Sequence, residues 1–277
     1  MKHNDETRQT YLALLAADGS LTVLENDQPE NLADFTSVDE LTVCPKPGRG
    51  EETSFRVRFD PNPEPCYTAL RAGVPTDALS LVVATMDSVK IYRTRDVTTV
   101  SYGVSSAGKQ LYLAAEIPGH RGLVRDVAWA PGNIRGYDII ATACQDSFVR
   151  VTRVDTPFSP DDGRSWSVGD LVKGGKPKDG SREPSLASGI RAELEKTGTS
   201  GGRRGADQPG HIKHTVRELS KLDCHRTPAW RVGFDDDGQI LGSVGDDGKL
   251  LCYRQTPDGS WAKSSELAMM KMRMAGP

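Results

Sequence analysis

The chain has 277 residues, with 35 Lys and Arg against 38 Asp and Glu, which gives a formal net charge of −3 at pH 7. This balance provides no broad cationic surface and argues against a nucleic-acid-binding protein. No stretch approaches the roughly 18 apolar residues of a membrane-spanning helix, and the polar start MKHNDETRQT lacks the pattern of a signal peptide.

Four segments along the chain share one pattern: an apolar run, an Asp, one or two small or polar residues, and an alternating run. They are Thr10–Glu25, Ser80–Arg93, Asp138–Arg153 and Gln239–Arg254. Each predicts two antiparallel strands joined by a turn. The residues expected in the turns are Asp18, Asp87, Asp146 and Asp247. A single hairpin cannot bury its faces, so repeated units of this kind must stack.

Two of the units carry a further strand upstream, each introduced by a histidine. The segments are GHRGLVRDVAWAP at 119–131 and HRTPAWRVGFDDDG at 225–238, with a weaker, histidine-free version at 54–61. Blades of WD-type propellers contain a buried network of His, Asp, a Ser or Thr, and Trp. The matching sets here are His120, Asp146 and Thr142, and His225, Asp247 and Ser243. Thr152 and Tyr253 stand where Trp would be, so we expect the network to be incomplete. Its expected role is to satisfy buried polar groups and fix the turn.

The spacing between the last two units is too long for one blade, which takes about 40–45 residues. The excess is rich in Gly, Ser, Lys, Arg and Asp, a composition that cannot bury enough apolar surface to fold. We therefore predict blades at 1–154 and 213–264, a disordered insert at 155–212 and a tail at 265–277. The insert contains a modest basic tract, which is either a solvated loop or a contact to nucleic acid or an import factor.

The cysteines and other ligand-type residues do not form a site of their own. The five cysteines lack CxxC spacing, and we expect them to be reduced thiols of a cytosolic or nuclear protein. A zinc site could draw on four neighbouring residues, but one of them is already assigned to the repeat. These residues are His211, His214, Cys224 and His225. The run Asp235–Asp237 could bind calcium, although an inter-strand turn ending in Gly238 fits it better. The His–Asp pairs have no nucleophile at a matching spacing, so we expect no catalytic residues, metal or cofactor.

The run from Gly119 to Arg153, with its WAP step and its IIATACQDS segment, resembles the nucleoporin branch of the Sec-thirteen-like WD-repeat family. Ala17–Phe35 resembles an earlier turn and strand of that branch, and Val244–Arg254 resembles its last blade. The resemblance covers most of residues 10–262 apart from the insert. It implies an all-β WD-repeat β-propeller. Members have six blades and a gap that is closed by a blade donated from a partner.

This chain supplies about three and a half such units, and it opens at Thr10 inside the second half of a blade. We therefore expect an incomplete propeller without the family's N-terminal blades.

The resemblance also implies a function and a set of partners. It indicates a non-enzymatic scaffold subunit of the nuclear pore Y-shaped complex at the nuclear envelope, which supports transport of mRNA and protein. In that family the same subunit also serves the vacuole-associated SEA/GATOR complex in TORC nutrient signalling. The implied partners are a helical-solenoid nucleoporin that donates a blade and other WD-repeat and solenoid scaffold proteins. No small-molecule substrate, membrane insertion or nucleic acid is expected. The alternative is a WD-repeat adaptor of a vesicle coat or ubiquitin ligase.

Overall fold

The computed structural model describes residues 1–5, 7–28, 30–31, 33–101, 104–132, 136–156, 212–223 and 225–268. The predicted insert at 155–212 lies outside these residues except at its two ends, and the predicted tail lies outside them from residue 269. Within the described ranges, no helix has the length and apolar character needed to cross a membrane.

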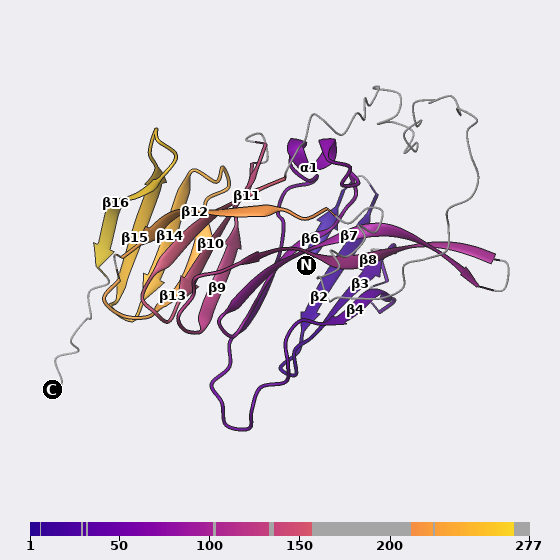
Figure 1. Cartoon of the computed structure of the whole chain (residues 1–277), viewed down its shortest axis with the longest axis horizontal. Coiled ribbons are helices and arrows are strands. Elements are labelled where there is room, and N and C mark those ends of the chain that lie inside the picture. Colours follow the sequence, from indigo (N-terminus) through magenta and orange to yellow (C-terminus); the bar gives the residue numbers. More distant parts are fainter. Residues whose placement is uncertain are drawn as a thin grey trace, which may run out of the picture. The chain divides into compact units, whose positions relative to one another are not determined.

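The described residues form four antiparallel sheets, each built from four strands that are paired in chain order (Figure 1). The first sheet contains β1 (Lys2–Asn4), β2 (Gln9–Leu15), β3 (Ser20–Asn26) and β4 (Thr36–Thr42). The second contains β5 (Phe55–Phe59), β6 (Ser80–Thr85), β7 (Ser88–Ser101) and β8 (Val104–Ile117). The third contains β9 (Val124–Trp129), β10 (Asp138–Cys144), β11 (Val149–Asp155) and β12 (Thr215–Leu222). The fourth contains β13 (Ala229–Phe234), β14 (Ile240–Gly245), β15 (Lys249–Gln255) and β16 (Trp261–Ala268).

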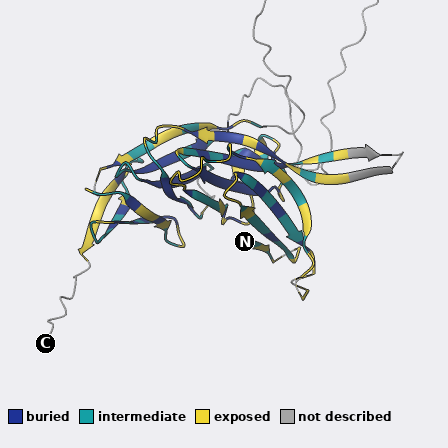
Figure 2. Cartoon of the chain, turned by 90° about the horizontal axis from the view of Figure 1, so that it is seen from below, coloured by how far each residue is buried: buried dark blue, intermediate teal, exposed yellow. Residues whose placement is uncertain are grey.

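The burial of each strand follows its hydrophobic pattern. In β3, Leu21 and Val23 are buried while Thr22 between them is only partly buried, as expected for a strand with one core face. In β10 every residue is buried, including the polar Asp138 and Thr142, which matches the position of this strand between two neighbouring strands. The last strand, β16, is exposed except at Trp261, and Figure 2 shows this exposed strand leading to the C-terminus.

The four predicted aspartates all lie in the turn between the second and third strands of their sheets. In three of the turns the carboxylate accepts the backbone N–H two residues later, from Ser20, Phe148 and Lys249. This local bond is the typical Asx turn. The next residue in each of these turns has a left-handed backbone, with φ of 89° at Gly19, 72° at Ser147 and 68° at Gly248. In the second sheet the left-handed residue is Met86, just before Asp87.

Successive sheets pack on each other through three hydrophobic clusters. The first and second sheets share a core that includes Leu21, Val23 and Leu81. The second and third share one around Ile91 and Val127. The third and fourth share one around Ile139, Val151, Leu241 and Tyr253. This stacking of four-stranded antiparallel sheets confirms an all-β, incomplete WD-type propeller.

The structure corrects the predicted number of units and one of their ends. The first sheet has a fourth strand, because β1 pairs with β2 through Lys2↔Tyr11 and Asn4↔Gln9. The described residues thus form four complete sheets, not three and a half units. The sequence KHN is polar and too short to show alternation, which is why the pattern missed it. The predicted blade boundary at 264 also falls inside β16. This strand remains paired with β15 as far as the residue pair Lys249↔Ala268.

A short helix, α1 (Tyr67–Arg71), lies in the connection between β5 and β6 and was not predicted. Its Ala69 packs with Cys66, Val74 and Ala78 in a small cluster of its own. With five residues, the helix is too short for the sequence to show a periodic apolar face.

Candidate functional site

The fourth sheet contains a complete chain of buried hydrogen bonds. The Nδ1 atom of His225 lies 3.2 and 3.1 Å from the two carboxylate oxygens of Asp247. Its Nε2 lies 2.7 Å from Oγ of Ser243, which in turn lies 3.1 Å from the hydroxyl of Tyr253. His225, Ser243 and Tyr253 are at most 2% exposed. Tyr253 therefore takes part through its hydroxyl, where the sequence suggested an incomplete network without Trp.

The third sheet repeats only half of this arrangement. The Nε2 of His120 lies 2.9 Å from Oγ1 of Thr142, as in the fourth sheet. However, Nδ1 of His120 is buried and has no hydrogen-bond partner among the described residues. The predicted bond between His120 and Asp146 is therefore wrong.

The carboxylate of Asp146 is held by an arginine instead of the histidine. Arg150 donates two bonds to it in a fork, from Nη1 at 3.1 Å and from Nη2 at 2.6 Å. The side chains of Asp146 and Arg150 are 9% and 2% exposed. Leu251 occupies the position in the fourth sheet that Arg150 occupies in the third, four residues after the turn aspartate. Since leucine cannot bind a carboxylate, Asp247 remains available to His225.

Burial and the contacts of Arg150 shift the pKa values of two side chains in the third sheet, Asp146 and His120. Burial opposes ionisation of Asp146, but its hydrogen bonds, first from Arg150, outweigh burial and lower its pKa to about 2. Burial, followed by the charge of Arg150, lowers the pKa of His120 to about 4. His120 is therefore neutral near pH 7. A neutral, partly buried histidine that is hydrogen-bonded to a threonine is suited to a structural role, not to proton transfer with a solvent-borne substrate.

The first two sheets have turn aspartates without a network. Asp18 accepts both the backbone N–H and the hydroxyl of Ser20, and these bonds lower its pKa. Asp87 lies in the tight turn between the paired residues Thr85 and Ser88. Neither sheet has a histidine in the position of His120 or His225.

A second buried polar cluster, between the second and third sheets, was missed by the sequence analysis. Arg93 of β7 donates from Nη2 to Asp138 of β10 at 2.6 Å, and their side chains are 0% and 2% exposed. The thiol of Cys66 donates to the same carboxylate at 3.6 Å. The guanidinium of Arg93 also lies 6.0 Å from the ring centre of Trp129. Arg93 and Asp138 are 45 residues apart and in different sheets, so no local pattern indicates the pair.

Asp60 extends this cluster toward the first strand. Its carboxylate accepts the backbone N–H of Asn62 at 2.9 Å and the Asn62 side chain at 2.7 Å. The Oδ1 of Asn62 accepts the N–H of Gly132, and Nζ of Lys2 donates to the Asn62 carbonyl at 2.6 Å. This corner joins β1, the end of β5 and the connection after β9.

Replacement of Asp60 by Asn should stabilise the protein above about pH 6. Burial, followed by the charge of Asp138, raises the pKa of Asp60 to about 6. In the unfolded chain this pKa is about 3.9, so the folded state loses stability as pH rises from about 4 to 6. Asn keeps the oxygen that accepts both bonds from Asn62 but cannot ionise. The gain should be on the order of 2 kcal/mol above pH 6 and vanish near pH 4, as measured by urea unfolding across this range. A gain that does not change with pH would contradict this assignment.

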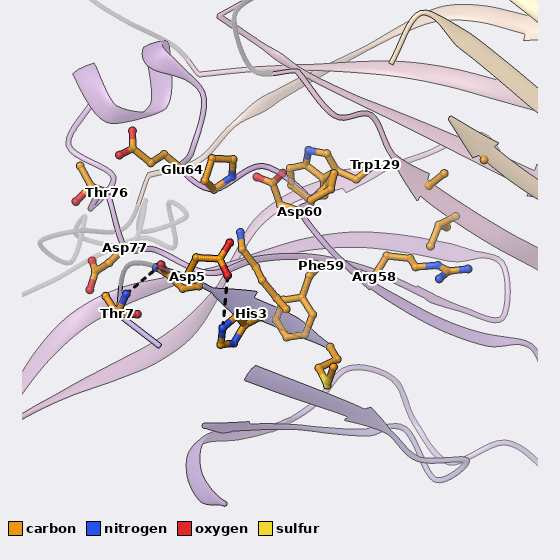
Figure 3. A pocket seen from close by; sticks show the side chains of 18 of the residues that line it. His3, Asp5, Thr7, Arg58, Phe59, Asp60, Glu64, Thr76, Asp77 and Trp129 are labelled. Atoms are coloured by element: carbon orange, nitrogen blue, oxygen red, sulfur yellow. Dashed lines mark hydrogen bonds and ion pairs between the residues drawn. The ribbon is translucent and has the colours of Figure 1, made fainter. Parts of the chain in front are cut away.

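A pocket of about 1170 Å³ lies beside this corner, lined by the N-terminal segment and by residues of β5, β9 and β13. Figure 3 shows that Asp5, Glu64 and Asp77 gather on one side of the pocket, while Arg58 lies on the other. Asp60 and Trp129 lie between them. The pocket therefore has an acidic and a basic end.

The structure describes two of the four residues considered for a zinc site, and these two have separate partners. His214 has Nδ1 2.9 Å from the hydroxyl of Thr156, and burial, then Arg93, lowers its pKa to about 3. His225 is held in the fourth-sheet network, while His211 and Cys224 lie outside the described residues. Among the residues with a described position, no group of three or more His, Cys, Asp or Glu could hold a metal ion.

Comparisons with known proteins identify one WD repeat and several related nucleoporins. The family model described as "WD domain, G-beta repeat" matches residues 111–153. Nucleoporin SEH1 of Chaetomium thermophilum is 53% identical over 100% of this chain and 63% of its own length. Nucleoporin seh1 of Schizosaccharomyces pombe is 29% identical over 88% of this chain and 56% of its own. Nucleoporin SEH1 of Saccharomyces cerevisiae is 27% identical over 88% of this chain and 60% of its own. The chain thus spans less than two thirds of the length of each of these relatives.

Proposed function

The chain is a WD-repeat homologue of the SEH1 nucleoporins, and from this premise we propose that it is a non-enzymatic scaffold subunit of the nuclear pore Y-shaped complex. In this role it supports transport of mRNA and protein at the nuclear envelope. It also serves the vacuole-associated SEA/GATOR complex in nutrient signalling. Its direct partner is a helical-solenoid nucleoporin that contributes a blade, with further WD-repeat and solenoid proteins around it.

One observation on the fourth sheet supports association of this kind. Val244, Leu250 and Leu267 are paired directly across β14, β15 and β16, so their side chains share one face. This face is opposite the one on which Leu251 and Tyr253 pack against the third sheet. Leu267 is 60% exposed and the other two are partly buried. None of the core clusters of the described residues contains these three side chains.

An apolar row that lies outside the hydrophobic clusters of the described residues is suited to the packing of another blade. Each neighbouring pair of sheets in this chain already packs in that way. We infer that the donated blade packs on this face, because burial of the row removes apolar area from water.

The experiment is a pull-down of the solenoid nucleoporin by the chain with Leu267→Ser, and by the chain with Leu250→Ser and Leu267→Ser together. Retention of the partner should fall in the single variant and be lost in the double variant. The control is Leu14→Ser on β2 of the first sheet, which removes an exposed leucine from a different sheet. Equal retention by all forms would reject the fourth-sheet face, and failure of the unaltered chain to retain the nucleoporin would reject the proposed partner. Recovery of coat or ubiquitin-ligase subunits in its place would favour an adaptor function.

A further inference from the structure

Three arginines from two sheets surround one buried carboxylate of the sheet between them. Asp126 of β9 is 2% exposed, and its Oδ2 accepts the backbone N–H of Val232 at 3.3 Å. Its carboxylate oxygens lie 4.0 Å from Nε of Arg56, 3.8 Å from Nη2 of Arg58 and 4.0 Å from Nη1 of Arg231. Arg56 and Arg58 belong to β5 and Arg231 belongs to β13, so the group joins the first strands of three successive sheets.

One carboxylate does not neutralise three guanidinium groups. At 3.8–4.0 Å these contacts are ion pairs without hydrogen bonds, and each guanidinium has five N–H donors. The side chains of Arg58 and Arg231 are 56% and 62% exposed, so many of their donors face solvent. The side chain of Arg56 is 38% exposed, and its Nη1 donates to the carbonyl of Phe55 at 2.9 Å. We call Arg56, Arg58 and Arg231 the arginine patch.

A neighbouring arginine and tryptophan extend the arginine patch. Arg125 of β9 is paired with Glu52 at 2.5 Å and lies 4.4 Å above the ring centre of Trp230. Trp230 is 37% exposed. The four arginines and the two carboxylates Asp126 and Glu52 leave a charge of 4 − 2 = +2 beside an accessible aromatic ring.

We propose that the arginine patch is a docking surface for an acidic segment of a partner protein in extended conformation. Arg56 and Arg58 alternate along β5 and point to the same face, about 6.7 Å apart along the strand. Carboxylates on alternate residues of an extended peptide have the same spacing, and the arginine fork matches a carboxylate in two-point contact. Trp230 adds apolar area next to the charges. The arginine patch lies on β5 and β13, whereas the apolar row of the fourth sheet lies on β14, β15 and β16. Binding at the arginine patch therefore does not require a blade packed on that row.

Two features favour an acidic peptide over a nucleic acid. The whole chain carries a net charge of −3, which disfavours the approach of a long polyanion. The pocket next to Arg58 has Asp5, Glu64 and Asp77 on its other side (Figure 3), so the attractive region is short. A few carboxylates fit such a region better than a continuous phosphate backbone.

The test measures binding of a fluorescein-labelled peptide of alternating Glu and Gly to the full chain by fluorescence polarisation at low ionic strength. Replacing Arg58 and Arg231 by Gln should raise the dissociation constant about tenfold or more, and Arg58→Gln alone should have a smaller effect. The matched control is Arg217→Gln with Arg254→Gln, which removes the same charge from exposed positions on β12 and β15. This control should change the dissociation constant by less than about twofold.

Three outcomes would overturn the proposal. They are no binding of the peptide by the unaltered chain, equal weakening by both double variants, and displacement of the peptide by a single-stranded oligonucleotide of equal charge at a lower concentration than unlabelled peptide. The last outcome would assign the arginine patch to a nucleic acid. Thermal unfolding of each variant verifies that the chain is folded, and the exposed positions of Arg58 and Arg231 make unfolding by these changes unexpected.

Discussion

Replacement of Asp138 by Asn should lower the free energy of unfolding by about 3–5 kcal/mol, because it removes the carboxylate that is hydrogen-bonded to a buried guanidinium. Arg93 is completely buried between the second and third sheets, and Asp138 is its ion-pair partner at 2.6 Å. Its Nε and Nη1 atoms have no hydrogen-bond partner among the described residues, so no second acceptor is in place to compensate. Urea unfolding followed by circular dichroism measures the loss.

A double variant separates the charge effect from loss of packing. Arg93→Met with Asp138→Asn removes both charges and keeps most of the side-chain volume. It should be considerably more stable than Asp138→Asn alone, since an apolar replacement of a buried ion pair is often tolerated. If the double variant instead loses the sum of the two single effects, the two side chains do not act as a pair.

Replacement of Asp146 by Asn should cost about 3 kcal/mol, because Arg150 would lose the carboxylate that receives both of its bonds. In a double-mutant cycle, Asp146→Asn and Arg150→Met should be strongly non-additive. His120→Ala should destabilise the third sheet through loss of its bond to Thr142, and its coupling to Asp146→Asn should be smaller. The measurement is again the free energy of unfolding in urea.

The fourth sheet supplies the control for this cycle. There His225 contacts Asp247 directly, so His225→Ala and Asp247→Asn should couple where His120 and Asp146 do not. A larger coupling of Asp146 to His120 than to Arg150 would contradict the partner exchange in the third sheet. Leu251 in the fourth sheet stands at the position of Arg150 in the third. The two sheets can therefore be compared directly, because they differ in which residue binds the turn aspartate.

The sequence by itself determined the repeated hairpins and their turns. The reason is that an Asx turn is local: Asp18, Asp146 and Asp247 each bind a backbone N–H only two residues away. Alternating and continuous apolar runs likewise specified which strands have one buried face and which have two. Repetition of these units was enough to predict an all-β propeller, because hairpins of this kind bury their faces only by stacking.

The tertiary structure alone decided which partner each buried polar group selects. The sequence shows Arg150 four residues after Asp146, but it does not show whether Arg150 or His120 is bonded to the Asp146 carboxylate. The structure shows that Arg150 is. The pair of Arg93 and Asp138 and the arginine patch around Asp126 join residues from different sheets. Such contacts depend on how the sheets stack, which is set by long-range packing of the whole core and leaves no periodic trace in the sequence. The strand β1 also depends on tertiary structure, since its three polar residues form a strand only by pairing with β2.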